Sequence, residues 1–122
     1  MNFFHNKTNL KGVNYLDITP FTINEFEEEN GIVTILIKKF KSKLMQAFLP
    51  RHRTNFIKIH LDETGSLVWM NIDGKKNVAE IIQAITIIKG DDLPDAEQRV
   101  IKFLTQLFQQ KFIGFRELTK KS

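Results

Sequence analysis

The residue types that could carry out chemistry are concentrated around position 60. His60, Asp62 and Glu63 supply nitrogen and oxygen atoms of the kind that bind zinc, and Ser66 follows closely. The chain has three histidines, at positions 5, 52 and 60, and no convincing set of metal ligands can be assembled from them. Asp62 and Ser66 are better explained by the start of a helix, where short polar side chains satisfy backbone N–H groups. We therefore expect no metal and no cofactor.

The motifs of the common enzyme classes are missing from the sequence. There is no cysteine, which excludes disulfides, thiolate zinc sites and cysteine nucleophiles. There is neither a glycine-rich phosphate-binding loop nor the Gly-x-Ser-x-Gly turn that presents a nucleophilic serine. These absences favour a binding protein over an enzyme.

Positive charge is concentrated in one part of the sequence. The window from Asn30 to Leu61 holds seven of the 18 lysines and arginines and none of the 14 acidic residues. Such a basic sector suits an anionic partner, namely an acidic peptide, nucleic acid or lipid headgroups, although a solvated lysine-rich surface is the alternative. Within it, residues 40–50 fit either a short basic amphipathic helix or a continued strand and loop, and 51–55 fit a loop. The candidate basic partner surface consists of Lys38, Lys41, Lys43, Arg51 and Arg53.

Length and composition indicate a single globular domain. A chain of 122 residues that is 42% hydrophobic can bury a core without a disulfide or a metal. Residues 1–19 are polar and weakly patterned, and we expect a flexible or loosely docked arm there, followed by one domain over 20–118. The N-terminus lacks the pattern of a signal peptide, and no apolar run is long enough to span a membrane. These features predict a cytoplasmic protein.

Three strands are expected in the first half of the chain. Two segments, near 21–28 and 31–39, are joined by Asn30-Gly31, a pair that readily adopts the positive φ angles of a tight hairpin turn. A third strand is expected over 56–61. Its alternation places Ile57, Ile59 and Leu61 on one face, expected to pack on the core, and Phe56, Lys58 and His60 on the other.

The second half of the chain shows the spacing of three helices. The first begins at the cap Asp62 and is expected to end at Asp73-Gly74, and the second begins with a capping box at Asn77. The third, over 96–110, is expected to stop at Gly114 and to lead into a short β tail. An apolar stripe with a helical period marks its buried face, formed by Val100, Phe103, Leu104, Leu107 and Phe108.

This order of elements predicts an α+β domain. Three helices are expected to pack on a small antiparallel sheet of about three N-terminal strands. Trp69 is expected to fill the core between the first helix and the sheet. The same ingredients, short helices next to strands, also make up a winged helix.

One long stretch of the sequence resembles a known family. Residues 58–82 read KIHLDETGSLVWMNIDGKKNVAEII. They are similar to the signature of the coenzyme PQQ synthesis protein D family, in which a strand leads into a capped helix, an Asp-Gly turn and a second capped helix. The resemblance extends over about 56–115, with Lys111-Phe112-Ile113 similar to the family's C-terminal ending. Two features depart from the pattern: the segment 39–55 is longer and more basic, and Asn77 stands where threonine or serine is commoner.

The resemblance implies binding without catalysis and a winged-helix-like fold. Members of the family recognise the leader of a ribosomally made precursor peptide and present it to a modifying enzyme, often a radical S-adenosylmethionine protein. The leader adds as a strand to an exposed sheet edge, beside the last helix. On this chain the implied edge is 56–61 and the implied helix is 96–110. The implied peptide-binding residues are Phe56, Lys58, His60, Lys102, Phe103 and Gln106.

Several alternatives stay open at this point. Lys58 and His60 also fit an ordinary solvent-exposed face, and Phe103 also fits the core. A winged helix that binds nucleic acid would carry basic residues on its second helix, but 78–87 contains none. A third possibility is an assembly subunit whose exposed strand pairs with a second copy to form a homodimer.

Overall fold

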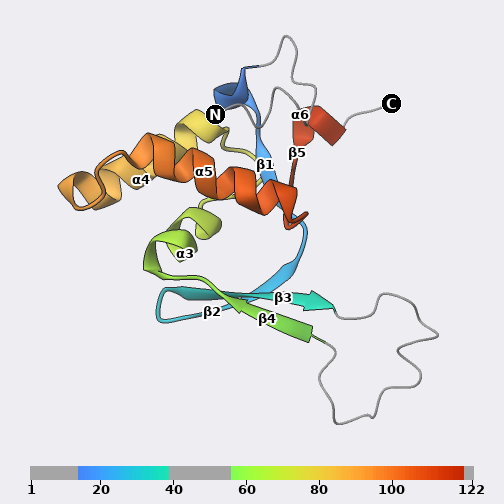
Figure 1. Cartoon of the computed structure of the whole chain (residues 1–122). Helices are drawn as coiled ribbons and strands as arrows, with labels where there is room; N and C mark the ends of the chain where they lie inside the picture. Colours follow the sequence, from blue (N-terminus) through green and yellow to red (C-terminus); the bar gives the residue numbers. More distant parts are fainter. Residues whose placement is uncertain (1–13, 39–55, 120–122) are drawn as a thin grey trace, which may run out of the picture.

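The computed structural model describes residues 14–38 and 56–119, with Phe56 and Thr119 described by their backbone alone. The strands form two small antiparallel sheets, and helix α3 lies between the larger sheet and helices α4 and α5 (Figure 1). The predicted α+β class is confirmed, while the likeness to a winged helix stays a prediction. In chain order the elements are η1 (Tyr15–Asp17), β1 (Pro20–Thr22), β2 (Glu25–Glu29), β3 (Ile32–Lys38), β4 (Phe56–His60), α3 (Glu63–Met70), α4 (Val78–Lys89), η2 (Gly90–Asp92), α5 (Ala96–Gln109), β5 (Ile113–Phe115) and α6 (Arg116–Thr119).

The larger sheet has the strand order β2-β3-β4. Its first turn is Asn30-Gly31, where φ is 55° at Asn30 and 83° at Gly31, as a two-residue turn between antiparallel strands requires. Glu28 Oε2 accepts the Gly31 N–H at 2.7 Å and tightens this turn. The predicted hairpin and the predicted third strand are both confirmed.

The segment predicted as a single strand near 21–28 is divided between the two sheets. β1 pairs with β5, with Phe21 opposite Gly114, whereas β2 pairs with β3. A Cβ atom at Gly114 would lie 2.7 Å from Cζ of the Phe21 ring, so glycine is required where the ring crosses β5. The prediction that Gly114 stops the third helix was therefore wrong, because this glycine serves strand pairing.

The end of α5 is formed by a different residue. Lys111 adopts a φ of 68°, and its N–H donates to Phe108 O at 3.0 Å. The Phe112 N–H donates to Leu107 O at 2.9 Å, which completes a Schellman motif and satisfies two carbonyls of the last turn. This helix end could not be predicted from the sequence, because lysine occupies the left-handed position that glycine usually takes.

The predicted helix starts are confirmed. Asp62 Oδ1 accepts the Gly65 N–H at 2.7 Å at the start of α3. At the start of α4, Asn77 Oδ1 accepts the Glu80 N–H at 2.8 Å, and Glu80 Oε1 accepts the Asn77 N–H at 2.9 Å. This reciprocal pair is a capping box, so both helices begin where their side chains satisfy otherwise unpaired N–H groups.

Helix α3 ends earlier than predicted, at Met70 and not at Asp73-Gly74. Asn71 Nδ2 donates to Leu67 O at 2.9 Å and closes the last turn. Ile72, only 7% exposed, then turns into the core and carries the chain away from the helix axis. Gly74, with a φ of 77°, belongs to the following turn.

Among the described residues, one hydrophobic core lies between the helices and the inner face of the larger sheet. Trp69 is 1% exposed and meets the Phe26 ring edge-on, with 5.7 Å between ring centroids, as expected for a residue between the first helix and the sheet. The predicted stripe of α5 is also confirmed. Its buried members are Val100, Leu104 and Leu107, and Phe103 and Phe108 are half-buried against the same core.

Packing begins before position 20, where the domain was predicted to start. Ile18 is fully buried, and its carbonyl accepts the Val78 N–H at 3.0 Å.

The two ends of the described chain are joined by hydrogen bonds. Glu117 accepts the Thr19 N–H at 2.7 Å and the Thr19 hydroxyl at 2.9 Å. Residues 116–119 form helix α6 and do not continue the predicted β tail.

A first prediction concerns the buried hydroxyl of Ser66, which accepts the Val33 N–H at 2.8 Å. Replacing Ser66 by alanine leaves this buried donor without a partner, so we expect the free energy of unfolding to fall by about 1–3 kcal/mol. Urea unfolding measures the change, with Thr86→Ala on the exposed face of α4 as the matched control. An unchanged midpoint for Ser66→Ala would contradict the role of this bond.

A second prediction concerns the pH dependence of the Thr19–Glu117 contact. Burial raises the pKa of Glu117, but hydrogen bonds from the Thr19 backbone, the Glu117 backbone and the Thr19 hydroxyl, together with the positive charge of Arg116, outweigh it, and the pKa is lowered. A lowered folded-state pKa stabilises the fold above the unfolded pKa, and this stability is lost as the pH falls through the folded value. We therefore expect Glu117→Gln to flatten the loss of stability on acidification, as measured by urea unfolding at neutral and acidic pH.

The same substitution at the exposed Glu97 is the control for that experiment. If Glu97→Gln flattened the acid limb as much as Glu117→Gln did, the contact with Thr19 would not be its cause.

Candidate functional site

Strand β4 leaves one edge of the larger sheet open. It pairs with β3 on one side, and no described residue pairs with it on the other. The Leu61 N–H donates to Val33 O at 2.9 Å, so the backbone groups of Leu61 point toward β3. Because the direction of backbone groups alternates along an antiparallel strand, Ile57 and Ile59 also point toward β3. The N–H and C=O groups of Lys58 and His60 therefore point toward the open edge.

The start of α3 holds this edge in place. The Val33 N–H, at the end of the ladder, donates to Ser66 Oγ and not to a strand carbonyl. Ser66 is fully buried one turn into the helix, and Asp62 caps the same turn. The strand β4, the cap and the first turn of α3 thus form one continuous rigid unit.

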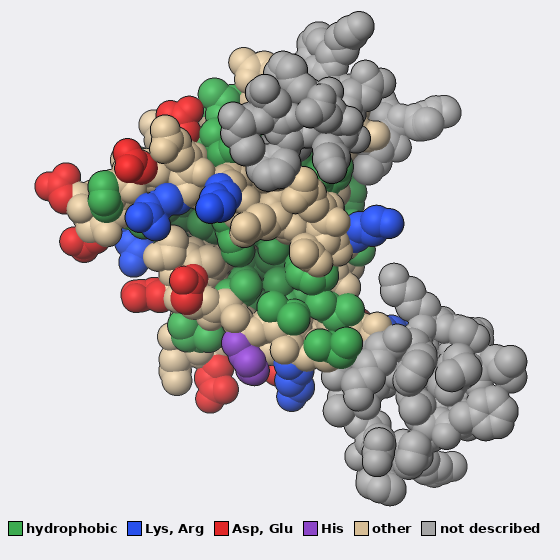
Figure 2. All heavy atoms as spheres, viewed as in Figure 1, with side chains coloured by type: hydrophobic (Ala, Val, Ile, Leu, Met, Phe, Trp, Pro, Cys, Tyr) green, Lys and Arg blue, Asp and Glu red, His purple; other side chains and the backbone are tan. Residues whose placement is uncertain are grey.

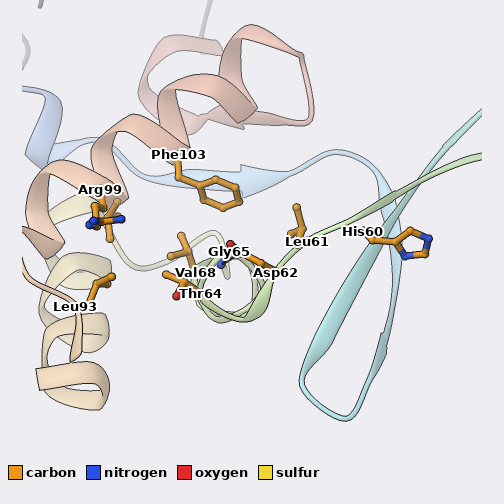
Figure 3. Close-up of a pocket in the computed structure, with 10 residues that line it drawn as sticks. His60, Leu61, Asp62, Thr64, Gly65, Val68, Leu93, Arg99 and Phe103 are labelled. Atoms are coloured by element: carbon orange, nitrogen blue, oxygen red, sulfur yellow. Dashed lines mark hydrogen bonds between the residues drawn. The ribbon is translucent and has the colours of Figure 1, made fainter.

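A cleft of about 480 Å³ lies between the end of β4, the first turn of α3 and helix α5. Leu61 and Phe103 point toward each other across it, over Gly65 (Figure 3). A Cβ at Gly65 would lie 3.2 Å from the Phe103 ring, so the ring rests directly on the helix backbone. The other lining residues include Val68, Val100 and Arg99.

The inner face of β4 extends the cleft as an apolar surface. Ile57 is 48% exposed, and Ile59 and Leu61 are half-buried beside it. Figure 2 shows hydrophobic side chains gathered in a continuous patch between α5 and the larger sheet. The expected packing of Ile57 on the core was wrong, because the described residues leave about half of its surface exposed.

The opposite face of β4 is polar. Lys58 and His60 are exposed there, and His60 Nδ1 lies 2.9 Å from Thr34 Oγ1 on β3. Figure 3 shows the His60 ring directed away from Phe103, on the far side of the strand. The side chains of β4 therefore divide between an apolar inner face and a basic outer face.

The sequence-predicted peptide-binding residues are only partly brought together. Phe103 lines the cleft, and His60 borders it although its ring is directed away from Phe103. Lys58 lies on the same outer face of the sheet as the His60 ring. Lys102 and Gln106 are exposed on α5. Phe56 occupies the first position of β4, and its side chain lies outside the described atoms.

Of the predicted basic partner surface, the structure describes Lys38, which is exposed at the end of β3. The rest of this prediction lies outside the described residues: Lys41, Lys43, Arg51 and Arg53.

Sequence reasoning missed Gly65 and Arg99 as lining residues. Gly65 had a signal, because glycine lowers helix stability and is often kept within a helix where another group approaches the backbone closely. Arg99 stands in the polar part of an amphipathic helix, and the sequence offers nothing to single it out.

Two kinds of site are not found in the part of the chain that the structure describes. Over 14–38 and 56–119, no group of three or more His, Asp or Glu side chains is placed to hold a metal ion. No helix within those ranges is both long and apolar enough to cross a membrane.

The family model for coenzyme PQQ synthesis protein D matches residues 52–113, half of the chain. The chain belongs to this family. No curated protein and no solved structure matches it. The matched region contains β4, α3, α4 and α5. It therefore includes both the open edge and the cleft.

The alternation along β4 leads to a third prediction. Amide hydrogen exchange should be slow at Ile59 and Leu61, whose N–H groups are bonded to β3, and fast at Lys58 and His60, whose N–H groups face the open edge. Exchange measured by NMR on dilute protein tests this. Slow exchange at Lys58 and His60 would show that another part of the chain covers the edge.

Proposed function

We propose that this chain is a non-enzymatic adaptor that binds the leader of a ribosomally made precursor peptide and presents it to a modifying enzyme. The observation that carries the proposal is an unpaired strand edge beside a cleft of mixed polar and apolar lining, both within the region matched by the family. A radical S-adenosylmethionine protein as the modifying enzyme, and a cytoplasmic location, belong to the same proposal.

Strand addition would use the backbone of β4 directly. Lys58 and His60 each offer one N–H and one C=O to an incoming strand, so a short extended segment can form several hydrogen bonds whatever its sequence. Every second side chain of that segment would then lie next to Ile57, Ile59 and Leu61. The cleft lined by Phe103 and Gly65 would receive the larger of these side chains.

The two other functions have less support. In α4, the helix that would enter a DNA groove, Lys89 at the last position is the one basic residue, so this helix lacks a basic recognition face. Pairing of β4 with a second copy uses the same open edge, and it predicts a mass that rises with protein concentration.

The sharpest test compares two substitutions at one position. Lys58→Pro removes an N–H that faces the open edge, where proline is tolerated, and leaves the bonds between β4 and β3 intact. We expect it to weaken binding of the precursor peptide encoded beside this chain's gene by about tenfold or more, because one hydrogen bond is lost and the added strand is obstructed. Lys58→Ala keeps the N–H and is expected to bind within a few-fold of the natural chain, as measured by NMR titration.

Two outcomes would contradict the proposal. Equal affinity of Lys58→Pro and Lys58→Ala would show that the backbone edge is not used. Peptide-induced shifts confined to residues away from β4 and α5 would place the binding surface elsewhere. Ile59→Pro, which interrupts the ladder to β3, is expected to unfold the sheet and serves as the control for proline placement.

A further inference from the structure

The two open edges of the larger sheet carry opposite charge. On β2, four of the five residues are glutamates, and all five positions are exposed. On β4, Lys58 and His60 are the charged or titratable side chains, and no acidic residue is present. The two edges present equivalent backbone groups, so their side chains must determine what each one accepts.

Three of the four β2 glutamates share one face of the sheet with Lys58 and His60, whereas Glu28 lies opposite the buried Val33 on the inner face. Glu25, Glu27 and Glu29 lie opposite Leu36, Thr34 and Ile32, which places them on the outer face. Lys58 and His60 lie opposite Leu36 and Thr34 on the other side of β3, and so belong to the same outer face. Charge on this face therefore changes from negative at β2 to positive at β4, with β3 between them.

Distance decides which charges an added strand would meet. Neighbouring strands are about 5 Å apart, so a strand added to β4 would lie about 5 Å from Lys58 and His60 and about 14 Å from the β2 glutamates. The Debye length at physiological ionic strength is about 8 Å, so the glutamates are largely screened at that position. The field at the added strand is therefore set by β4.

Other described groups do not cancel this field. Thr34 Oγ1 holds the His60 ring at 2.9 Å, and Lys38 adds a further exposed positive charge at the end of β3. Asp62, beyond the end of β4, is the nearest acid in sequence, and its carboxylate is used by the Gly65 N–H on the cleft side. The outer side of the β4 edge thus carries the positive charge of Lys58 and no acidic side chain.

We infer that the segment bound at β4 has acidic side chains at alternate positions, which lie beside Lys58 and His60, and apolar side chains at the positions between them, which face the cleft. This inference rests on the proposed function and adds to it the chemical class of the ligand. The same acidic positions exclude that segment from β2, where they would meet Glu25, Glu27 and Glu29, so one chain binds one peptide.

The experiment uses two synthetic probes and the full-length chain. In one short peptide valine alternates with glutamate, and in its twin lysine replaces every glutamate. Each is titrated into labelled protein and followed by NMR. We expect the glutamate peptide to bind roughly three- to tenfold more tightly at low salt, since cross-strand charge pairs are individually weak. High salt should narrow the difference.

A charge reversal on the protein completes the test. Lys58→Glu should invert the preference between the two peptides, whereas Lys75→Glu, an exposed lysine in the turn before α4, should leave it unchanged. Equal affinities for the two peptides, with shifts at β4, would overturn the charge inference and leave strand addition standing. No shift at β4 with either peptide would overturn the proposed function together with the inference. Shifts at β2 in place of β4, or a concentration-dependent mass without peptide, would also overturn the inference.

Discussion

The first turn of α3 is the constraint on which the rest of the site depends. Its serine hydroxyl accepts the last N–H of the β3 ladder, and its aspartate cap fixes the point at which β4 becomes helix. A strand edge can recognise a partner only if its own hydrogen-bonding groups are held in register. Here the register is held at one end by a buried hydrogen bond from Val33 to the helix residue Ser66, so the edge can stay unpaired while the sheet keeps its hydrogen bonds.

The same turn sets the shape of the cleft. Because Gly65 has no side chain, the Phe103 ring of α5 rests directly on the backbone of α3, and the cleft lies between these two helices and the end of β4. The sheet below supplies a row of isoleucine and leucine side chains that are only partly covered. Backbone groups for affinity and an apolar surface for selectivity therefore come from one small group of elements, all within the region that the family shares.

Much of this arrangement follows from local signals in the sequence. Asn30-Gly31 specifies the hairpin, Asn77 and Glu80 specify the start of α4, and the apolar stripe of α5 identifies its buried face, because each depends on residues a few positions apart. Pairing of β1 with β5 was not predictable in this way, since its partners lie at opposite ends of the chain. The end of α5 was missed because a lysine takes the left-handed conformation there. Ile57 was also mispredicted. The alternation of residues identifies the inner face of a strand, but it does not show whether other residues cover that face.

The pairing of β1 with β5 also determines how the domain can be attached to other proteins. Together with the Thr19–Glu117 bonds, it gathers both ends of the described chain on the side of the molecule away from β4 (Figure 1). A neighbouring domain joined directly at Asn14 or Thr119 would therefore be attached on the side opposite the open strand. The fold is in this sense modular: it can be carried by a larger polypeptide while its open strand still faces outward.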